Sequence, residues 1–105
     1  MKEIDDITYN EIFATTLTPI LIYFWATWCM PCKMKTPMIE NLAQQFEGKV
    51  LFTKADSDLT SEMKKLFEIK GTPTVIILNK GMVVKNIVGK NITRENIELI
   101  LNELL

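Results

Sequence analysis

The segment ILIYFW (residues 20–25) constrains the fold more than any other part of the chain. It is a run of β-branched and aromatic residues that follows Pro19, and this pattern predicts a strand buried on both faces. Such a strand needs helices over both faces of its sheet. The apolar run is also far shorter than the roughly 20 residues of a membrane-spanning helix, so we expect no membrane span.

Strand-like and helix-like stretches alternate along the whole chain. Helical spacing of apolar residues predicts helices from about residue 8, over 33–46, over 60–70 and from about residue 93, and further strands are predicted over 50–56, 74–78 and 82–88. The coarse order is β-α-β-α-β-α-β-β-α. Two parallel crossovers followed by a hairpin and a closing helix predict an α/β fold, with a mixed sheet and helices on both faces.

Local signals predict where several helices begin, bend and end. Thr8 and Glu11 have capping-box spacing for the first helix, Pro37 is expected to kink the second, and Gly48 has the place of its C-cap. We expect these side chains to lie in the core: Met34, Met38, Leu42, Phe46, Met63, Leu66 and Phe67.

The only two cysteines, Cys29 and Cys32, follow the buried strand within the segment WCMPCK. With Cys29 as the N-cap of the next helix, the cysteines lie in the first turn with Cα atoms about 5–6 Å apart, within reach of a disulfide. Pro31 has no N–H to donate, so the N–H of Cys32 is expected to face the Cys29 sulfur.

This placement would favour a reactive thiolate. A free cysteine has a pKa of about 8.5, whereas the cysteine of a C-x-x-C pair at a helix N-terminus is commonly near 7. The positive end of the helix contributes roughly 0.3–1 kcal/mol to an exposed negative charge there. An attack of one cysteine on a partner's disulfide, resolved by the other cysteine, is the chemistry that this geometry allows.

Two other interpretations of the cysteine pair stay open at this point. The cysteines could be inert core residues, or they could be half of a metal site. A zinc site as a rule needs four ligands, and the chain has two cysteines and no histidine, so a second chain or carboxylates would have to complete it. An iron–sulfur cluster would likewise have to be shared across a dimer.

Charge and the N-terminal sequence narrow the partners and the compartment. The net charge is −1 with both signs mixed along the chain, so there is no electrostatic basis for binding nucleic acid or an anionic membrane. Acidic residues interrupt any apolar run near the N-terminus, so we expect no secretory signal and a cytoplasmic protein. A close cysteine pair in the cytoplasm is more often catalytic or metal-binding than structural.

Several motifs resemble the thioredoxin family, and the resemblance covers essentially all 105 residues in order. FWATWCMPCK resembles the active-site segment, Pro37 matches the helix-kinking proline, and KGTPT resembles the cis-proline loop at Pro73. NKGMVVKNIVGK resembles the hairpin, with Gly81 in its turn. The resemblance implies the thioredoxin fold in a single domain over residues 1–105: a three-layer α/β/α structure with a five-stranded mixed sheet and four helices.

The resemblance also implies roles for individual residues. Cys29 would be the nucleophile and Cys32 the resolving cysteine, with no metal and no bound cofactor beyond their reversible disulfide. The implied supporting residues are Trp28, Pro31, Lys33, Lys54 and Tyr23, and the implied substrate groove consists of Trp28, Met30, Thr72, Pro73 and Gly89.

Two positions depart from the family pattern. Met30 replaces the usual glycine and adds apolar, adaptable surface beside Cys29. Tyr23 replaces the buried acid that is thought to help deprotonate the second cysteine, and with a pKa near 10 a tyrosine is a poor base at neutral pH. We therefore hypothesise that Cys32 loses its proton to water with the help of Lys54.

The absence of histidine bears on the direction of electron flow. Oxidising relatives usually carry a histidine between the cysteines, so we expect a potential nearer the roughly −270 mV of thioredoxin than the roughly −120 mV of DsbA. The implied activity is protein-disulfide reduction by a monomer that thioredoxin reductase, a flavoenzyme fed by NADPH, re-reduces. The alternatives are a disulfide oxidase or isomerase, and a redox-inactive binding subunit.

Overall fold

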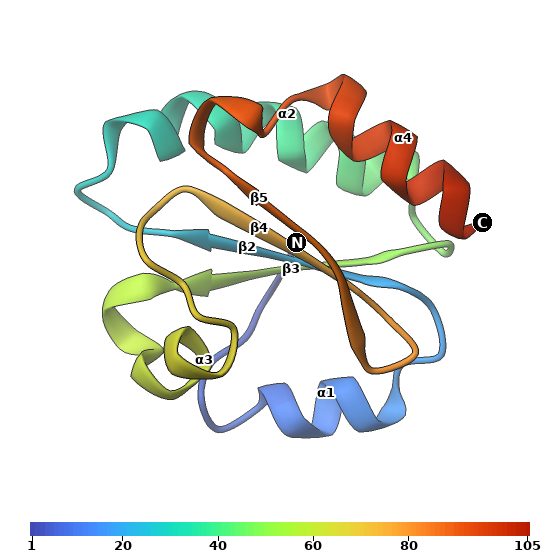
Figure 1. Ribbon diagram of the computed structural model, residues 1–105, viewed down its shortest axis with the longest axis horizontal. Helices are drawn as coiled ribbons and strands as arrows, with labels where there is room; N and C mark the ends of the chain where they lie inside the picture. The colour runs from blue at the N-terminus through green and yellow to red at the C-terminus, as the bar shows by residue number, and fades with distance from the viewer.

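The protein forms five strands and four helices in the predicted order, and the computed structural model describes all of residues 1–105 (Figure 1). The strands are β1 (Lys2–Glu3), β2 (Ile20–Trp25), β3 (Leu51–Asp56), β4 (Thr74–Asn79) and β5 (Met82–Val88). The helices are α1 (Tyr9–Thr15), α2 (Met30–Gln45), α3 (Ser61–Leu66) and α4 (Arg94–Leu104), and 3₁₀ turns lie at Ser57–Leu59 and Gly89–Asn91.

All five strands belong to one mixed sheet, in the order β1-β3-β2-β4-β5. Strands β1 and β2 are parallel to β3, whereas β4 is antiparallel to β2 and β5 is antiparallel to β4. The central position of β2 explains why its sequence is apolar throughout, because it has a neighbouring strand on each side and helices above and below.

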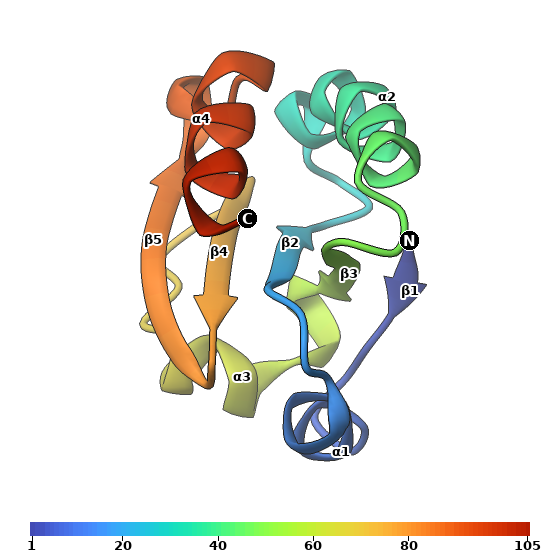
Figure 2. The ribbon, with the colours of Figure 1, turned by 90° about the vertical axis from the view of Figure 1, so that its right-hand side faces the viewer.

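Alternate side chains of β2 enter the two halves of the core, as the pleat of a strand requires. Leu21 and Tyr23 pack in the apolar cluster under α2 and α4. Ile20, Ile22 and Phe24 pack in the second cluster, over α1 and α3. Figure 2 shows the sheet between these two helix pairs, so the predicted three-layer α/β/α architecture is confirmed.

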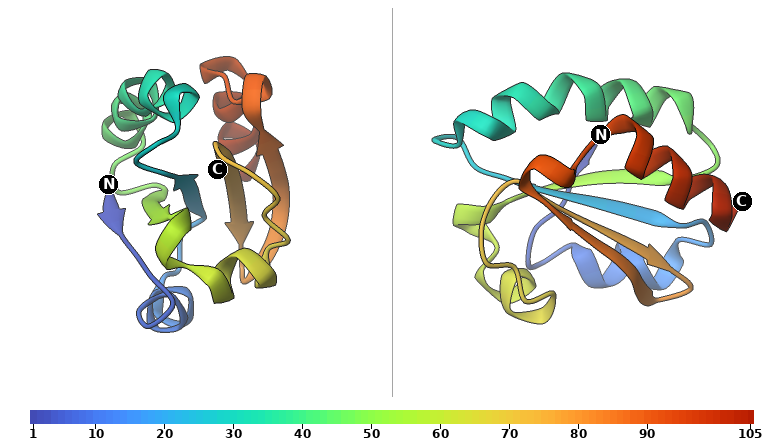
Figure 3. Two further views of the ribbon diagram at one scale, coloured as in Figure 1. Left: turned by 90° about the vertical axis from the view of Figure 1, so that its left-hand side faces the viewer. Right: turned by 45° about the horizontal axis from the view of Figure 1, so that its top comes forward.

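Helices α2 and α4 lie on the same face of the sheet (Figure 3), and hydrogen bonds between polar side chains join them. The Arg94 guanidinium donates to Asn41 Oδ1 at 2.7 Å and to Gln45 Oε1 at 3.3 Å. Gln45 Nε2 in turn donates to Glu98 Oε2 at 2.9 Å. These contacts hold the carboxyl-terminal half of α2 against α4.

No helix combines the length and the apolar character that crossing a membrane would require.

The predicted turn between β4 and β5 is a two-residue loop. Lys80 and Gly81 have φ values of 54° and 79°, and Asn79 pairs with Met82 on either side of them. Positive φ at both loop residues matches the twist of a hairpin, and glycine adopts it without steric cost.

The predicted capping box at the start of α1 is wrong. The Thr8 side chain caps nothing and instead accepts the N–H of Asp5 at 3.1 Å. Asp5 Oδ1 accepts the N–H groups of Ile7 and Thr8, each at 2.9 Å. These donors, Thr8 first, hold the pKa of Asp5 below its ordinary value. A charged carboxylate is a stronger hydrogen-bond acceptor than a neutral hydroxyl. Asp5, which accepts the N–H groups of two consecutive residues, therefore sets the conformation of this turn.

Two predicted core positions are exposed. Met34 is 76% exposed because it lies two residues after the buried Cys32, about 200° around the helix. Leu66 is 57% exposed because α3 ends there, whereas Met63 is fully buried as predicted. Gly48 has the expected positive φ of 83°, but α2 already ends at Gln45, so Gly48 shapes the following turn and is not the cap.

Candidate active site

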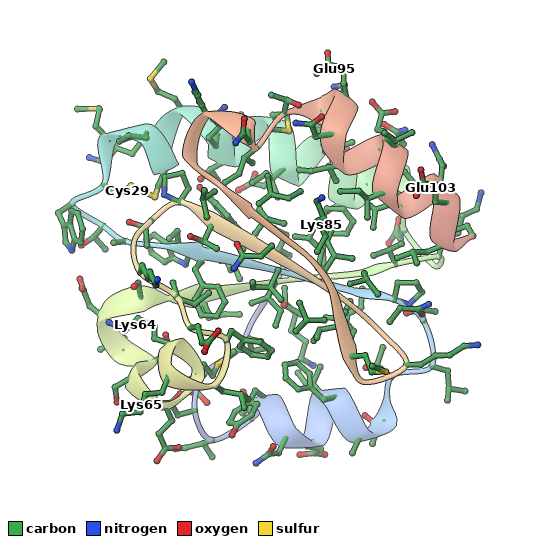
Figure 4. All side chains as sticks on the ribbon, in the orientation of Figure 1. Cys29, Lys64, Lys65, Lys85, Glu95 and Glu103 are labelled. Atoms are coloured by element: carbon green, nitrogen blue, oxygen red, sulfur yellow. A yellow bond between two sulfur atoms is a disulfide. The ribbon has the colours of Figure 1, made fainter.

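Cys29 lies where β2 leads into α2, and Figure 4 labels it at the start of that helix. It is the N-cap residue, with an extended backbone at φ −88° and ψ 106°. Its Sγ accepts the N–H of Cys32 at 3.2 Å. Pro31 lies between them and has no N–H to donate, so the geometry predicted from the spacing is confirmed.

Cys29 and Cys32 form a disulfide, with their Cα atoms 5.3 Å apart. This separation is within the range that the spacing predicts and that disulfides adopt. Only 3% of Cys29 and 2% of Cys32 is exposed. Any group that reaches the Cys29 sulfur must therefore pass over the residues that surround it.

The start of α2 favours negative charge at Cys29 once the disulfide is reduced. Helix N-termini carry unpaired N–H groups and the positive end of the helix dipole. Cys29 is the cysteine that accepts such an N–H, whereas Cys32 supplies one. Of the two cysteine sulfurs, the one that faces an amide of the helix start is therefore that of Cys29.

The backbone carbonyl of Cys32 is bonded by two side-chain hydroxyls. Tyr23, which is 1% exposed, donates its OH to this carbonyl oxygen at 2.9 Å, and the OH lies 3.0 Å from Thr36 Oγ1. The Thr36 hydroxyl donates to the same oxygen at 2.7 Å. Burial raises the pKa of Tyr23 above its ordinary value, so its hydroxyl keeps its proton at neutral pH.

Thr36 is a site residue that sequence reasoning missed. The available signal was indirect: a buried tyrosine hydroxyl needs a partner, and a threonine one turn after Cys32 can supply one. Tyr23 was predicted as a supporting residue, and the structure places it in direct contact with the main chain of the second cysteine.

A pocket of about 300 Å³ opens beside Cys32. Tyr23, Lys33 and Lys54 line it, and the Lys54 ammonium lies 5.5 Å from the centre of the Trp25 ring. No aspartate or glutamate is among its lining residues. Three of the predicted supporting residues are thus brought together around the second cysteine, without the carboxylate that the family pattern would place there.

Trp28 and Met30 are the exposed neighbours of Cys29 in the chain. Trp28 is 68% exposed and Met30 is 64% exposed. The indole N–H of Trp28 donates to Asp58 Oδ2 at 2.9 Å. Asp58 belongs to the 3₁₀ turn after β3 and was not predicted as part of the site. It fixes the orientation of the ring, so Trp28 presents a defined apolar surface beside the disulfide.

Strand register brings the cis-proline loop to the same edge of the sheet. Thr74, the first residue of β4, pairs with Phe24 near the end of β2 and with Val88 at the end of β5. The residues just before Thr74 and just after Val88 therefore lie near the loop that carries Cys29. Residues far apart in the sequence form this edge because β4 runs antiparallel to both of its neighbours.

Thr72, Pro73 and Gly89 line a groove of about 710 Å³ at this edge. The Thr72–Pro73 peptide bond is cis, as the motif implies. Gly89, at φ 53°, donates its N–H to the Pro73 carbonyl at 3.1 Å and so ties the two segments together. The predicted groove residues Thr72, Pro73 and Gly89 are assembled here, while Trp28 and Met30 lie outside this lining.

The side chains of the protein offer no cluster of three or more cysteine, aspartate or glutamate groups that could hold a metal ion. The chain also contains no histidine.

Comparison with known proteins gives a consistent result over most of the chain. A family model described as Thioredoxin matches residues 1–103. Thioredoxin 1 of a Nostoc species is 33% identical over 87 residues, which are 83% of this chain and 81% of that protein. Thioredoxin of Haemophilus influenzae is 36% identical over 86 residues, which are 82% of this chain and 80% of that protein.

A longer relative combines two activities in its name. The bifunctional thioredoxin reductase/thioredoxin of Mycobacterium leprae is 39% identical over 87 residues, which are 80% of this chain. The match spans only 19% of that protein, so the similarity concerns one part of it.

Proposed function

The chain belongs to the thioredoxin family, and from this premise we propose that it is a protein-disulfide reductase in which Cys29 is the nucleophile and Cys32 the resolving cysteine. One observation carries the assignment of roles: Cys29 caps α2 and its sulfur accepts the Cys32 N–H at 3.2 Å. A thiolate is stabilised at that position, and the thiolate is the attacking species in disulfide exchange.

The proposed reaction moves two electrons from the dithiol to a partner's disulfide. The Cys29 thiolate attacks one partner sulfur, forming a mixed disulfide, and the other partner sulfur leaves as a thiolate. Cys32 then loses its proton and attacks the Cys29 sulfur, which releases the second partner sulfur as a thiolate. The product is the oxidised form with the Cys29–Cys32 disulfide, the state that the structure contains.

We propose that the partner lies as an extended segment between Trp28 and Met30 on one side and the groove of Thr72, Pro73 and Gly89 on the other. Two observations support this: Trp28 and Met30 flank Cys29 in the chain, and Thr74, which lines the groove, pairs with Phe24 near the end of the strand that leads to Cys29. With only 3% of Cys29 exposed, a partner that does not fill this surface has little access to the sulfur. Met30 makes the surface more apolar and adaptable, so we expect partners with apolar side chains next to their disulfide.

A thioredoxin reductase, a flavoenzyme that draws electrons from NADPH, is the proposed source of electrons, and the chain itself is proposed to hold no cofactor. The name of the Mycobacterium leprae relative, which combines thioredoxin reductase and thioredoxin, supports this pairing. Incubation of the oxidised protein with NADPH and a bacterial thioredoxin reductase should consume NADPH in proportion to the protein's disulfide. No consumption with any reductase tried, despite reduction by dithiothreitol, would argue against this partner.

We propose that residues 1–105 act as one domain and as a monomer in the cytoplasm. A single five-stranded sheet with one apolar cluster on each face supports the single domain. The reductase direction supports the compartment, because the cytoplasm keeps thiols reduced. Sedimentation of the purified protein and fractionation of cells test the last two points.

Insulin reduction coupled to dithiothreitol tests the assigned function. The wild type should accelerate insulin precipitation, Cys29→Ser should abolish the acceleration, and Cys32→Ser should stay joined to its partners as a mixed disulfide. Equal partner capture by all three proteins, with no reductase activity in any, would instead favour a redox-inactive binding subunit. A redox equilibrium with glutathione above about −200 mV would overturn the reductase direction in favour of an oxidase or isomerase.

A further inference from the structure

The main chain of Cys32 is held at both of its polar groups. Its N–H donates to Cys29 Sγ at 3.2 Å, and its carbonyl oxygen accepts the hydroxyls of Tyr23 at 2.9 Å and Thr36 at 2.7 Å. Tyr23 comes from the centre of the sheet and Thr36 from the next turn of α2. The residue that must attack the mixed disulfide is thus fixed to two different elements.

Neither of the two hydroxyls on the Cys32 carbonyl oxygen is suited to accept a proton. Burial is the largest effect on the pKa of Tyr23 and raises it. The Thr36 hydroxyl lowers this pKa by a smaller amount, and the charge of Glu40 on α2 raises it again. The charged groups that line the pocket beside Cys32 are Lys33 and Lys54, and no carboxylate faces it. Burial, with the charge of Glu40, keeps the tyrosine hydroxyl protonated, and so a hydrogen-bond donor, throughout the neutral range.

We propose that Tyr23 and Thr36 are a positioning pair for the resolving cysteine, whose two hydroxyls hold the Cys32 carbonyl and so keep Cys32 aligned for attack on Cys29 without exchanging protons themselves. This inference rests on the proposed function. It assigns Thr36 a role in the reaction and replaces an acid–base role at position 23 with a geometric one.

The step in which the pair acts is the release of the partner. The Cys32 thiol gives its proton to water, and its sulfur attacks Cys29 Sγ. The Cys29–Cys32 bond forms as the bond between Cys29 and the partner sulfur breaks, and the partner sulfur leaves with the electron pair. Because attack requires the two cysteine sulfurs and the leaving sulfur in line, a small rotation of Cys32 slows this step.

The test follows the reduced protein after mixing with an aromatic disulfide whose thiolate product absorbs visible light. Attack by Cys29 releases the first aromatic thiolate, and attack by Cys32 releases the second, so the two steps appear as separate phases. Loss of one hydrogen bond is worth about 0.5–1.5 kcal/mol, and we therefore expect Tyr23→Phe and Thr36→Val each to slow the second phase roughly threefold to tenfold. Thr36→Ser, which keeps the hydroxyl, should retain the wild-type rate.

Matched controls are available in the same chain. Tyr9→Phe removes the only other tyrosine hydroxyl, and Thr53→Val removes a buried threonine hydroxyl that donates to the Leu21 carbonyl at 2.9 Å. Both should leave the second phase within about twofold of wild type. Because Tyr23 and Thr36 share one acceptor, the double variant should be slowed less than the product of the single effects.

Each outcome decides a specific point. Second-phase rates for Tyr23→Phe and Thr36→Val equal to wild type, with both variants less stable in urea, would show that the hydroxyls serve folding alone. An additional ionisation in the pH profile of the wild-type second phase that disappears in Tyr23→Phe would show proton transfer by Tyr23, against the proposal. If Tyr23→Phe does not fold, the second-phase rates of Thr36→Val and Thr36→Ser decide: the proposal requires Thr36→Val to be slower, and equal rates would refute it. A wild type that releases no second thiolate would refute the proposed function itself.

Discussion

Replacement of Pro31 by alanine tests how the first turn of α2 controls the reactive sulfur. Cys29 Sγ accepts one N–H of that turn, from Cys32 at 3.2 Å, because Pro31 has none to give. An N-cap side chain can accept from either of the second and third helical residues. Pro31→Ala supplies the missing donor, so the thiolate of Cys29 should gain a second hydrogen bond.

The size of the effect follows from the charge on the acceptor. A hydrogen bond to a charged group contributes about 1.5–3 kcal/mol, and sharing one sulfur between two donors places the gain near the lower end. Since about 1.4 kcal/mol corresponds to one pH unit, the midpoint of Cys29 ionisation should fall by about one unit. The same free energy makes the disulfide about 30 mV more oxidising. Loss of the proline should also destabilise the protein by about 0.4–1 kcal/mol through the unfolded chain.

Alkylation of the reduced protein by iodoacetamide across a pH series measures the midpoint, and equilibration with glutathione measures the potential. Pro19→Ala is the matched control, because it removes a proline from the loop before β2, away from the cysteines. It should change stability but not the alkylation midpoint. A midpoint for folded Pro31→Ala that stays at the wild-type value or rises would refute the argument that first-turn amides stabilise the thiolate.

Further predictions concern stability. Met63 is fully buried, so Met63→Ala should cost about 2–5 kcal/mol in urea unfolding, whereas Met34→Ala, at a 76% exposed position, should stay within about 0.5 kcal/mol of wild type. Burial raises the pKa of Tyr23 above 10.0. The stability that the neutral Tyr23 hydroxyl contributes is therefore complete below pH 10 and is lost as the pH rises through the raised pKa. Tyr23→Phe should lack this loss of stability when urea unfolding is measured across an alkaline pH series. Hydrogen bonds from the backbone N–H groups of Thr8 and Ile7 lower the pKa of Asp5 below 3.8. The stability that the Asp5 carboxylate contributes is therefore present above pH 3.8 and is lost as the pH falls through the lowered pKa. The stability difference between wild type and Asp5→Ala should therefore narrow in acid, and a constant difference would contradict this reasoning.

The geometry of the cysteines was predictable because it is local. Cys29, Pro31 and Cys32 lie within one turn, and the backbone of a helix start fixes their relative positions whatever surrounds them. The order of strands and helices was predictable for a similar reason, since the period of the apolar residues reports which face each segment buries. The same reasoning failed for Leu66, where the helix ends and the period no longer applies.

Contacts between distant segments were decided only by the tertiary structure. The contact between Tyr23 and Thr36 joins residues 13 apart, and that between Trp28 and Asp58 joins residues 30 apart. Each depends on how β2 and β3 are aligned in the sheet and on where α2 lies across them. Sequence patterns give the apolar face of an element, but not its rotation and register at the precision of a hydrogen bond.

The sequence by itself thus determined the reactive pair and the type of fold around it. The surroundings of Cys32, with two hydroxyls on its carbonyl and no carboxylate in its pocket, came from packing. The physical reason is the distance along the chain over which each interaction acts. A helix start is stabilised by residues within four positions of it. A contact between side chains of a strand and a helix forms only when the packing of the whole core has set the distance between those elements.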